Sequence, residues 1–176
     1  MDSSASRCRQ MARVAEEYCC LIDEFEPGSL AREWWLRLEW LLPRLHVAVI
    51  ALRGSHEEPA AAYSLPDDEL RFELYMRLYD RLYANPLLWS SLSEYRLLAR
   101  LCDRLADDLT DMYFDLRRGL DLLEAYPGDP ERAVHDWQSS FRAHWAQHLL
   151  DAERWLHAVD AAERGTAARP WQTMVV

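Results

Sequence analysis

The sequence LARLCDRLADDLTDMYFDLRRGLDLLEAY, residues 98–126, contains the longest regular pattern of the chain. Leucine or methionine returns every three or four positions, which places these side chains on one face of an α-helix. The positions are Leu98, Leu101, Leu105, Leu109, Met112, Leu116, Leu120 and Leu123. Pro127-Gly128 is a typical helix stop. Because a helix of this length needs a partner for its apolar stripe, the pattern favours an all-α fold.

The same helical period recurs on both sides of this stretch. It predicts helices over about residues 6–25, 29–53, 66–85, 91–126 and 130–164. We therefore expect a single-domain antiparallel bundle of about five long amphipathic helices over 1–164, with a flexible tail over 165–176. Pro43 lies inside the second helix, so we expect a kink there, because proline removes one hydrogen bond and clashes with the preceding turn. Gly119, alone inside a helix, is expected to permit close helix packing.

Composition excludes several classes of function. The 176 residues include 30 acidic and 20 basic residues, for a formal net charge of −10. All the basic residues are arginine, which excludes Schiff-base or P-loop lysine chemistry. An acidic chain without a basic stripe is a poor match for nucleic acid or for anionic membranes. No signal peptide, membrane span or paired-cysteine zinc spacing is visible, so we expect a cytoplasmic protein with reduced thiols.

An acidic ridge follows the fourth predicted helix. Aspartate recurs every four residues from Asp103 to Asp115, and Asp108 stands beside the ridge. Like charges at this spacing repel by a few tenths of a kcal/mol per pair, so the ridge is either a solvated face or a carboxylate cluster for Mg²⁺ or Mn²⁺. Asp108 and Asp115 lie nearest the apolar stripe, and Asp111 lies further out.

A histidine pair follows on the fifth predicted helix. His144 and His148 are four residues apart on one face, a spacing at which two imidazoles can chelate one metal ion. The alternative is a pair of structural histidines, hydrogen-bonded to aspartates of the fourth helix. If the two helices meet, the candidate metal ligands are Asp108, Asp111, Asp115, His144 and His148.

Two segments resemble a known family. They are Ala106-Asp-Asp-Leu-Thr-Asp-Met-Tyr-Phe-Asp-Leu-Arg-Arg-Gly-Leu120 and Trp137-Gln-Ser-Ser-Phe-Arg-Ala-His-Trp-Ala-Gln-His148, the second running on to His157. Together with residues 14–19 and 42–45, they resemble the bacterial domain-of-unknown-function family DUF5063 over roughly residues 10–160. The resemblance implies an all-helical cytoplasmic bacterial protein. It implies no activity and transfers no catalytic residue.

Three functions remain open from the sequence. The first is a non-enzymatic protein-interaction module that binds a partner or itself, with Trp34, Trp35 and Trp40 as the binding surface, because tryptophan and arginine dominate interface hot spots. The second is a metal-dependent hydrolase or metal-binding bundle. Helical nucleotide pyrophosphohydrolases use two acidic pairs around magnesium, but here Glu17 has Cys20 where the first pair needs an acid.

The third function is a small-molecule binder with an aromatic pocket. A ridge of tyrosines on the third predicted helix and two tryptophans beside the histidine pair could line such a pocket. The residues considered are Tyr75, Tyr79, Trp137 and Trp155.

Overall fold

The computed structural model describes residues 4–25, 31–52, 67–85, 88 and 95–164. These residues form helices and their connecting turns, with no strand among them, which confirms the predicted all-α bundle. The helices are α1 (Ser4–Asp23), α2 (Ala31–Ala51), α3 (Asp68–Tyr83), α5 (Tyr95–Ala125), α6 (Glu131–Ser140), the π-helical η1 (Phe141–Trp145) and α7 (Ala146–Glu163). The predicted tail over 165–176 and the first residues of the fourth predicted helix, 91–94, lie outside the described residues.

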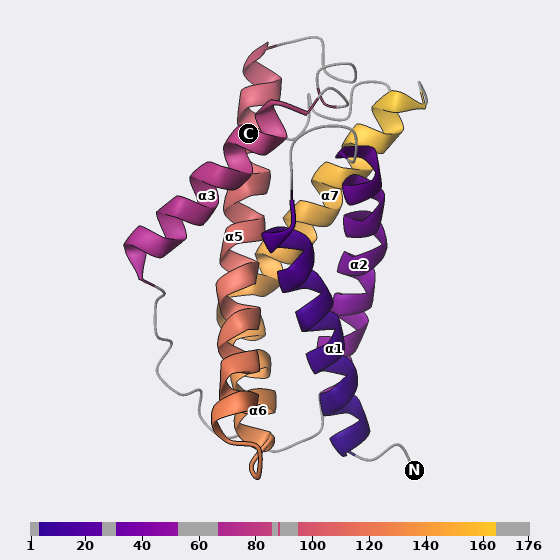
Figure 1. Ribbon diagram of the computed structural model, residues 1–176. Coiled ribbons are helices and arrows are strands. Elements are labelled where there is room, and N and C mark those ends of the chain that lie inside the picture. Colours follow the sequence, from indigo (N-terminus) through magenta and orange to yellow (C-terminus); the bar gives the residue numbers. More distant parts are fainter. Residues whose placement is uncertain (1–3, 26–30, 53–66, 86–87, 89–94, 165–176) are drawn as a thin grey trace.

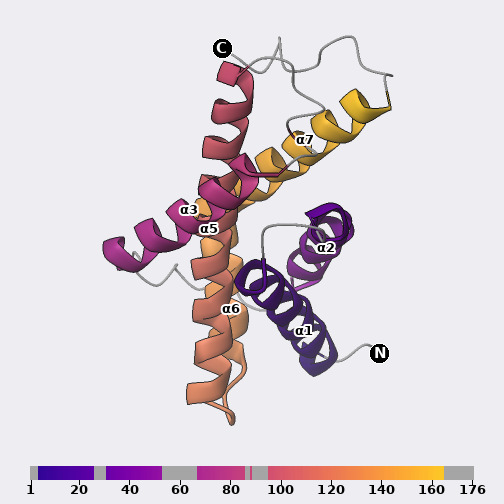
Figure 2. The same ribbon diagram turned by 45° about the horizontal axis from the view of Figure 1, so that its top comes forward.

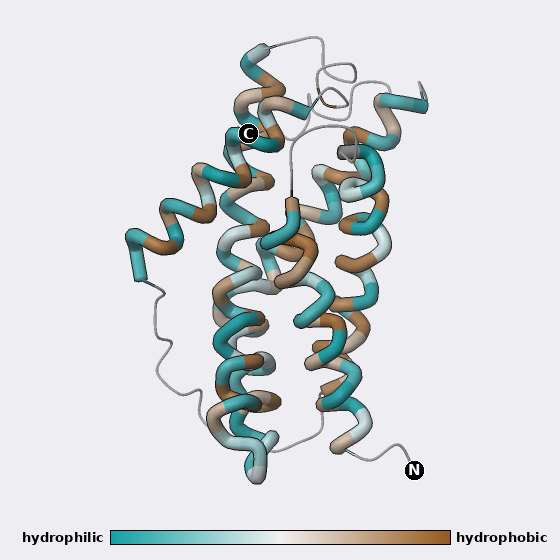
Figure 3. The backbone as a smooth tube through the Cα atoms, viewed as in Figure 1, coloured by the Kyte–Doolittle hydropathy of each residue, from teal (hydrophilic) through white to brown (hydrophobic). Residues whose placement is uncertain are grey.

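The long helix α5 is the centre of the arrangement. It contacts α1, α3, α6 and α7, while α2 packs against α1 and α7. Figures 1 and 2 show α1 and α2 side by side, with α3 leaning across α5 at a steep angle. Figure 3 shows apolar and polar residues alternating along every helix, which is typical of amphipathic helices. The apolar faces meet in one buried core to which every helix contributes.

Two helices illustrate how local sequence and packing together set the fold. Asp67 caps α3, because its side chain accepts hydrogen bonds from the backbone N–H groups of Glu69 and Leu70. In the core, the fully buried Tyr18 of α1 donates a hydrogen bond of 2.8 Å to the carbonyl of Leu109 in α5. This bond satisfies the only polar group of the tyrosine side chain and fixes α1 on α5.

At Gly119, a residue of α6 lies directly against the backbone of α5. A Cβ atom at this position would lie 2.0 Å from Nε1 of Trp137, which is fully buried. The same Nε1 donates to the carbonyl of Leu116 at 3.2 Å. The absent side chain therefore makes room for the indole, which confirms the predicted role of the glycine in helix packing.

The last predicted helix is interrupted. The backbone N–H of Ala146 bonds the carbonyl of Phe141, five residues back, so η1 is one wide turn between α6 and α7. A wide turn of this kind adds a residue to the helix and changes the direction of every side chain that follows. In α2, by contrast, the helix continues through Pro43, and the kink there stays a prediction.

Two tryptophans of the predicted binding surface belong to the core. Trp34 and Trp35 are only 5% and 3% exposed, and Trp34 stacks on Phe25 with ring centroids 3.8 Å apart. Trp40, at 76%, is the exposed member of the three. The expectation of an exposed cluster at Trp34 and Trp35 is therefore corrected, because both rings lie on the face of α2 that packs inward.

No helix among the described residues has the length and apolarity needed to cross a membrane.

Candidate metal centre

The acidic ridge of α5 and the histidine pair meet at one place in the fold. His144 lies in η1 and His148 in the first turn of α7, and both imidazoles face α5. The rings contact each other edge to face, with centroids 4.9 Å apart. The wide turn contributes to this geometry, because it sets the direction of both side chains relative to α6.

Each histidine is held by an aspartate of its own. His144 Nδ1 lies 2.7 Å from Asp115 Oδ2, and His148 Nδ1 lies 2.9 Å from Asp108 Oδ1. When a neutral imidazole donates its Nδ1–H to a carboxylate, its Nε2 keeps a lone pair and can accept a proton or a metal ion. Histidine ligands in metal sites are oriented by a second carboxylate in the same way.

The two Nε2 atoms converge on Asp111. Its Oδ2 lies 3.4 Å from His148 Nε2 and 4.0 Å from His144 Nε2. One ligand atom from each of the three residues lies within 4.8 Å of the others. Two ligands of a tetrahedral zinc ion, each about 2.1 Å from the metal, are about 3.4 Å apart. The distance from Asp111 to His148 matches this spacing, and the distance from Asp111 to His144 exceeds it.

Arg71 of α3 contacts the same carboxylate from the other side. Its Nε and Nη2 donate to both oxygens of Asp111 at 2.6 and 2.9 Å, and Nη2 also reaches Asp107 at 2.7 Å. These bonds raise the pKa of the Arg71 guanidinium. Asp111 is only 7% exposed, because α3 and its arginine cover it. The sequence placed Asp111 further from the core and gave no indication of Arg71.

Burial and hydrogen bonding shift the pKa values of Asp108 and His148. Desolvation raises the pKa of Asp108 to about 6, although the hydrogen bond from His148 acts in the opposite direction. The same hydrogen bond raises the pKa of His148 above its ordinary value. Oδ2 of Asp108 is buried and has no hydrogen-bond partner among the described residues, so the carboxylate is only half satisfied.

The five candidate ligands divide into two groups. Asp111, His144 and His148 offer ligand atoms to one point, whereas Asp108 and Asp115 are bonded to the outer nitrogens of the histidines. Asp115 is fully buried and also accepts a bond from Arg118, which in turn donates to Asp136 at 2.9 Å. Asp115 and Asp108 therefore contact the histidines at Nδ1, whereas Asp111 lies on the Nε2 side of both rings.

The residues of the alternative functions lie elsewhere. Glu17 binds Arg44 at 2.7 Å and Arg13 at 3.2 Å on the surface between α1 and α2. Tyr75 donates to Asp103 at the edge of α5, and Trp137 is fully buried between helices. Three surface grooves beside α2 are lined by neither of these aromatic residues.

Comparison with known proteins gives a family and no activity. Neither the curated proteins nor the solved structures contain a significant match to the chain. The model of the domain of unknown function DUF5063 matches residues 3–162, a range that includes the whole site and confirms the resemblance seen in the sequence. Since this match covers most of its length, the chain belongs to the DUF5063 family.

Proposed function

We propose that this protein binds a transition-metal ion through Asp111 Oδ2, His144 Nε2 and His148 Nε2. One observation carries the proposal: the Nδ1 atoms of both histidines are bonded to aspartates, and their Nε2 atoms point to a third. A structural histidine needs one partner, and that bond alone does not require the Nε2 atoms of both histidines to face one further carboxylate. Two imidazoles and one carboxylate form a recurrent ligand set for zinc and for non-haem iron(II).

The ligand set changes the metal expected from the sequence. The acidic ridge indicated Mg²⁺ or Mn²⁺, which prefer oxygen ligands, whereas imidazole suits zinc and iron(II). The histidine side chains are 28% and 21% exposed, so solvent reaches one side of the cluster. Three protein ligands leave a position for water in a tetrahedral or larger coordination sphere. This geometry supports metal-assisted activation of water as the candidate reaction class, with the substrate unspecified.

The competing interpretation is a polar seam that joins α3, α5 and α7 without a metal. Arg71 supports it, since its positive charge already compensates Asp111. The two interpretations differ in one measurable quantity, the affinity of the protein for an added ion. If these residues form only a seam, replacing His148 or Asp111 changes the stability of the protein and not its affinity for a metal ion.

The experiment is calorimetric titration of metal-stripped protein with Zn²⁺ and, under anaerobic conditions, with Fe²⁺. We expect saturable binding of one ion per chain, lost in His148→Ala and in Asp111→Asn. Two matched controls lie on the same helices at exposed positions: His157→Ala on α7 and Asp103→Asn on α5. Both should bind as the unmodified protein does. The proposal is refuted if the unmodified protein binds neither ion saturably, or if the controls lose binding together with the site variants.

A further inference from the structure

The first turns of α3 are attached to α5 through one side chain. Before Leu74, the first buried residue of α3, every residue of the helix except Arg71 is exposed. Arg71 precedes Leu74, Leu78 and Leu82 on the same face of the helix. Among the described residues, it is the one side chain of these turns with a hydrogen bond to another helix. Since this end of α3 projects away from the bundle in Figures 1 and 2, its attachment depends on what Arg71 binds.

The carboxylate that Arg71 binds is also the candidate ligand of the metal centre. Nη2 of Arg71 lies 2.9 Å from Oδ2 of Asp111, the same oxygen that lies 3.4 Å from Nε2 of His148. A zinc ion bound about 2.1 Å from this oxygen would lie at most about 5 Å from Nη2. The ion and the guanidinium would then be two positive charges beside one buried carboxylate, and each would weaken the hold of the other.

A second carboxylate is available to Arg71. Its Nη2 also donates to Asp107 at 2.7 Å, and the Asp107 side chain is 37% exposed. Asp107 is not one of the three residues whose ligand atoms converge. The arginine can therefore leave Asp111 without losing every ion pair, which lowers the cost of its release.

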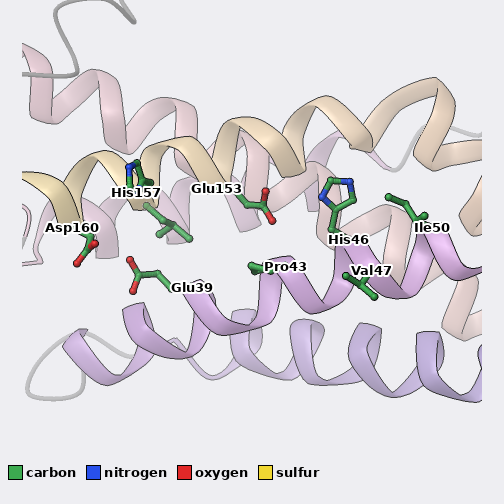
Figure 4. A pocket seen from close by; sticks show the side chains of 9 residues that line it. Glu39, Pro43, His46, Val47, Ile50, Glu153, His157 and Asp160 are labelled. Carbon is green, nitrogen blue, oxygen red and sulfur yellow. The ribbon is translucent and has the colours of Figure 1, made fainter.

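The groove between α2 and α7 shows carboxylates that have no such arginine. In Figure 4, Glu39 of α2 stands across from Asp160 of α7, and Glu153 lies further along the groove. Among the described residues, neither glutamate has an ion pair, and burial raises the pKa of both carboxyl groups. Asp111 is covered more completely, and its charge is compensated by Arg71. In the metal-free protein, the guanidinium thus has the charge-compensating role that an ion would have.

We propose that metal binding releases the start of α3 from α5. The inference rests on the proposed function, because the ion is the one bound by Asp111, His144 and His148. In the metal-free chain, Arg71 compensates Asp111 and holds α3 over the centre. With the ion bound, the guanidinium keeps only its bond to Asp107. Because coupling between two binding events is reciprocal, a contact that opposes metal binding is itself weakened by the metal.

The release would change access to the centre. Asp111 is only 7% exposed, because α3 and Arg71 cover it. When the first turns of α3 move away, the side of the centre next to α3 opens to solvent. The ion would then both occupy the ligands and uncover them, so that a substrate reaches the centre only after the metal has bound.

Hydrogen–deuterium exchange of the full chain tests this release. In the metal-free chain, the backbone N–H of Arg71 is bonded to the carbonyl of Asp67 at 2.9 Å. Saturation with Zn²⁺ should speed exchange of the amides at 71–74 about threefold or more, because this turn loses its bonds to Asp111. The amides at 39–50, in the helix that lines the groove of Figure 4, are the internal control and should exchange at an unchanged rate.

Two variants of α3 test whether the effect passes through the arginine. Arg71→Gln removes the ion pair with Asp111, so the amides of this turn should exchange rapidly both with and without zinc. Arg77→Gln is the matched control on the same helix, because Arg77 pairs with Asp23 of α1 at 3.6 Å. This control should keep the full response to zinc.

Calorimetry on the same samples distinguishes the two levels of failure. Zinc that binds without speeding exchange at 71–74, or that slows it, overturns the release and leaves the proposed function standing. A chain that binds no zinc refutes both. The release is also overturned if Arg71→Gln retains the zinc response, since the effect then does not depend on the arginine.

Discussion

Replacing Gly119 by alanine should destabilise the protein, although alanine is the better helix former. The added Cβ would overlap the indole of Trp137 at 2.0 Å from Nε1 and 2.3 Å from Cε2. The indole is fully buried and held by its bond to Leu116, so it cannot turn aside without cost. The variant therefore forces α5 and α6 apart or displaces the ring from its hydrogen bond.

The magnitude follows from three opposing contributions. Overpacking of a core costs about 1–3 kcal/mol, and loss of the indole hydrogen bond adds about 1 kcal/mol. Alanine returns about 1 kcal/mol through its helix propensity. The net loss in the free energy of unfolding is about 2 kcal/mol, which corresponds to a decrease in Tm of about 4–8 °C for a domain of this size.

Urea denaturation followed by far-ultraviolet circular dichroism measures this loss. Gly128→Ala is the matched control, because no atom lies within 4 Å of its added Cβ and its backbone has no left-handed φ. It should leave stability unchanged or raise it by less than about 1 kcal/mol. Combining Gly119→Ala with Trp137→Phe should cost less than the sum of the two single changes. If Gly119→Ala is as stable as the unmodified protein, the proposed contact does not determine the spacing of the two helices.

The remaining predictions concern the metal centre and the thiols. Asp115→Asn should weaken zinc affinity about 10–100-fold in calorimetry without abolishing it, because the residue orients a ligand; complete loss would make it a ligand. Arg71→Gln should lower stability in urea yet strengthen metal binding, since it removes a positive charge from the ligand carboxylate; weaker metal binding would contradict this. In metal-free protein, the pKa of His148 is raised, so its stabilisation is present below its unfolded value of 6.5 and lost as the pH rises through the folded pKa. The raised pKa of Asp108 acts in the same direction at lower pH, so the unfolding free energy measured in urea should fall as the pH rises from 3.8 to about 6 and again above 6.5; a free energy that rises over these ranges would contradict this. Finally, a thiol reagent should label only Cys20 in the native protein and all four cysteines after unfolding, because the other three are buried with raised pKa values; a second rapidly labelled thiol would show that a core helix opens.

Much of the site could be predicted from local sequence. The period of the leucines determined the helices, and the four-residue spacing of the aspartates and of His144 and His148 placed each set on one helix face. These are properties of a single helix, so they can be read without knowing its neighbours. The expectation that the two sets meet followed from the need of two long amphipathic helices to pack together.

The division of roles within the site depended on tertiary structure. The rotation of α5 against α7 determines which aspartate faces the Nε2 atoms of both histidines. The π-helical turn η1 changes this rotation, and the sequence gives no signal for it, since η1 contains no proline or glycine. Arg71 reaches Asp111 from 40 residues away in the chain. Trp34 and Trp35 are buried while Trp40 is exposed, because α2 has an inner and an outer face. Helical periodicity is a local property of the backbone, whereas the pairing of faces depends on how the side chains of different helices fill one core, and only the packed structure specifies that arrangement.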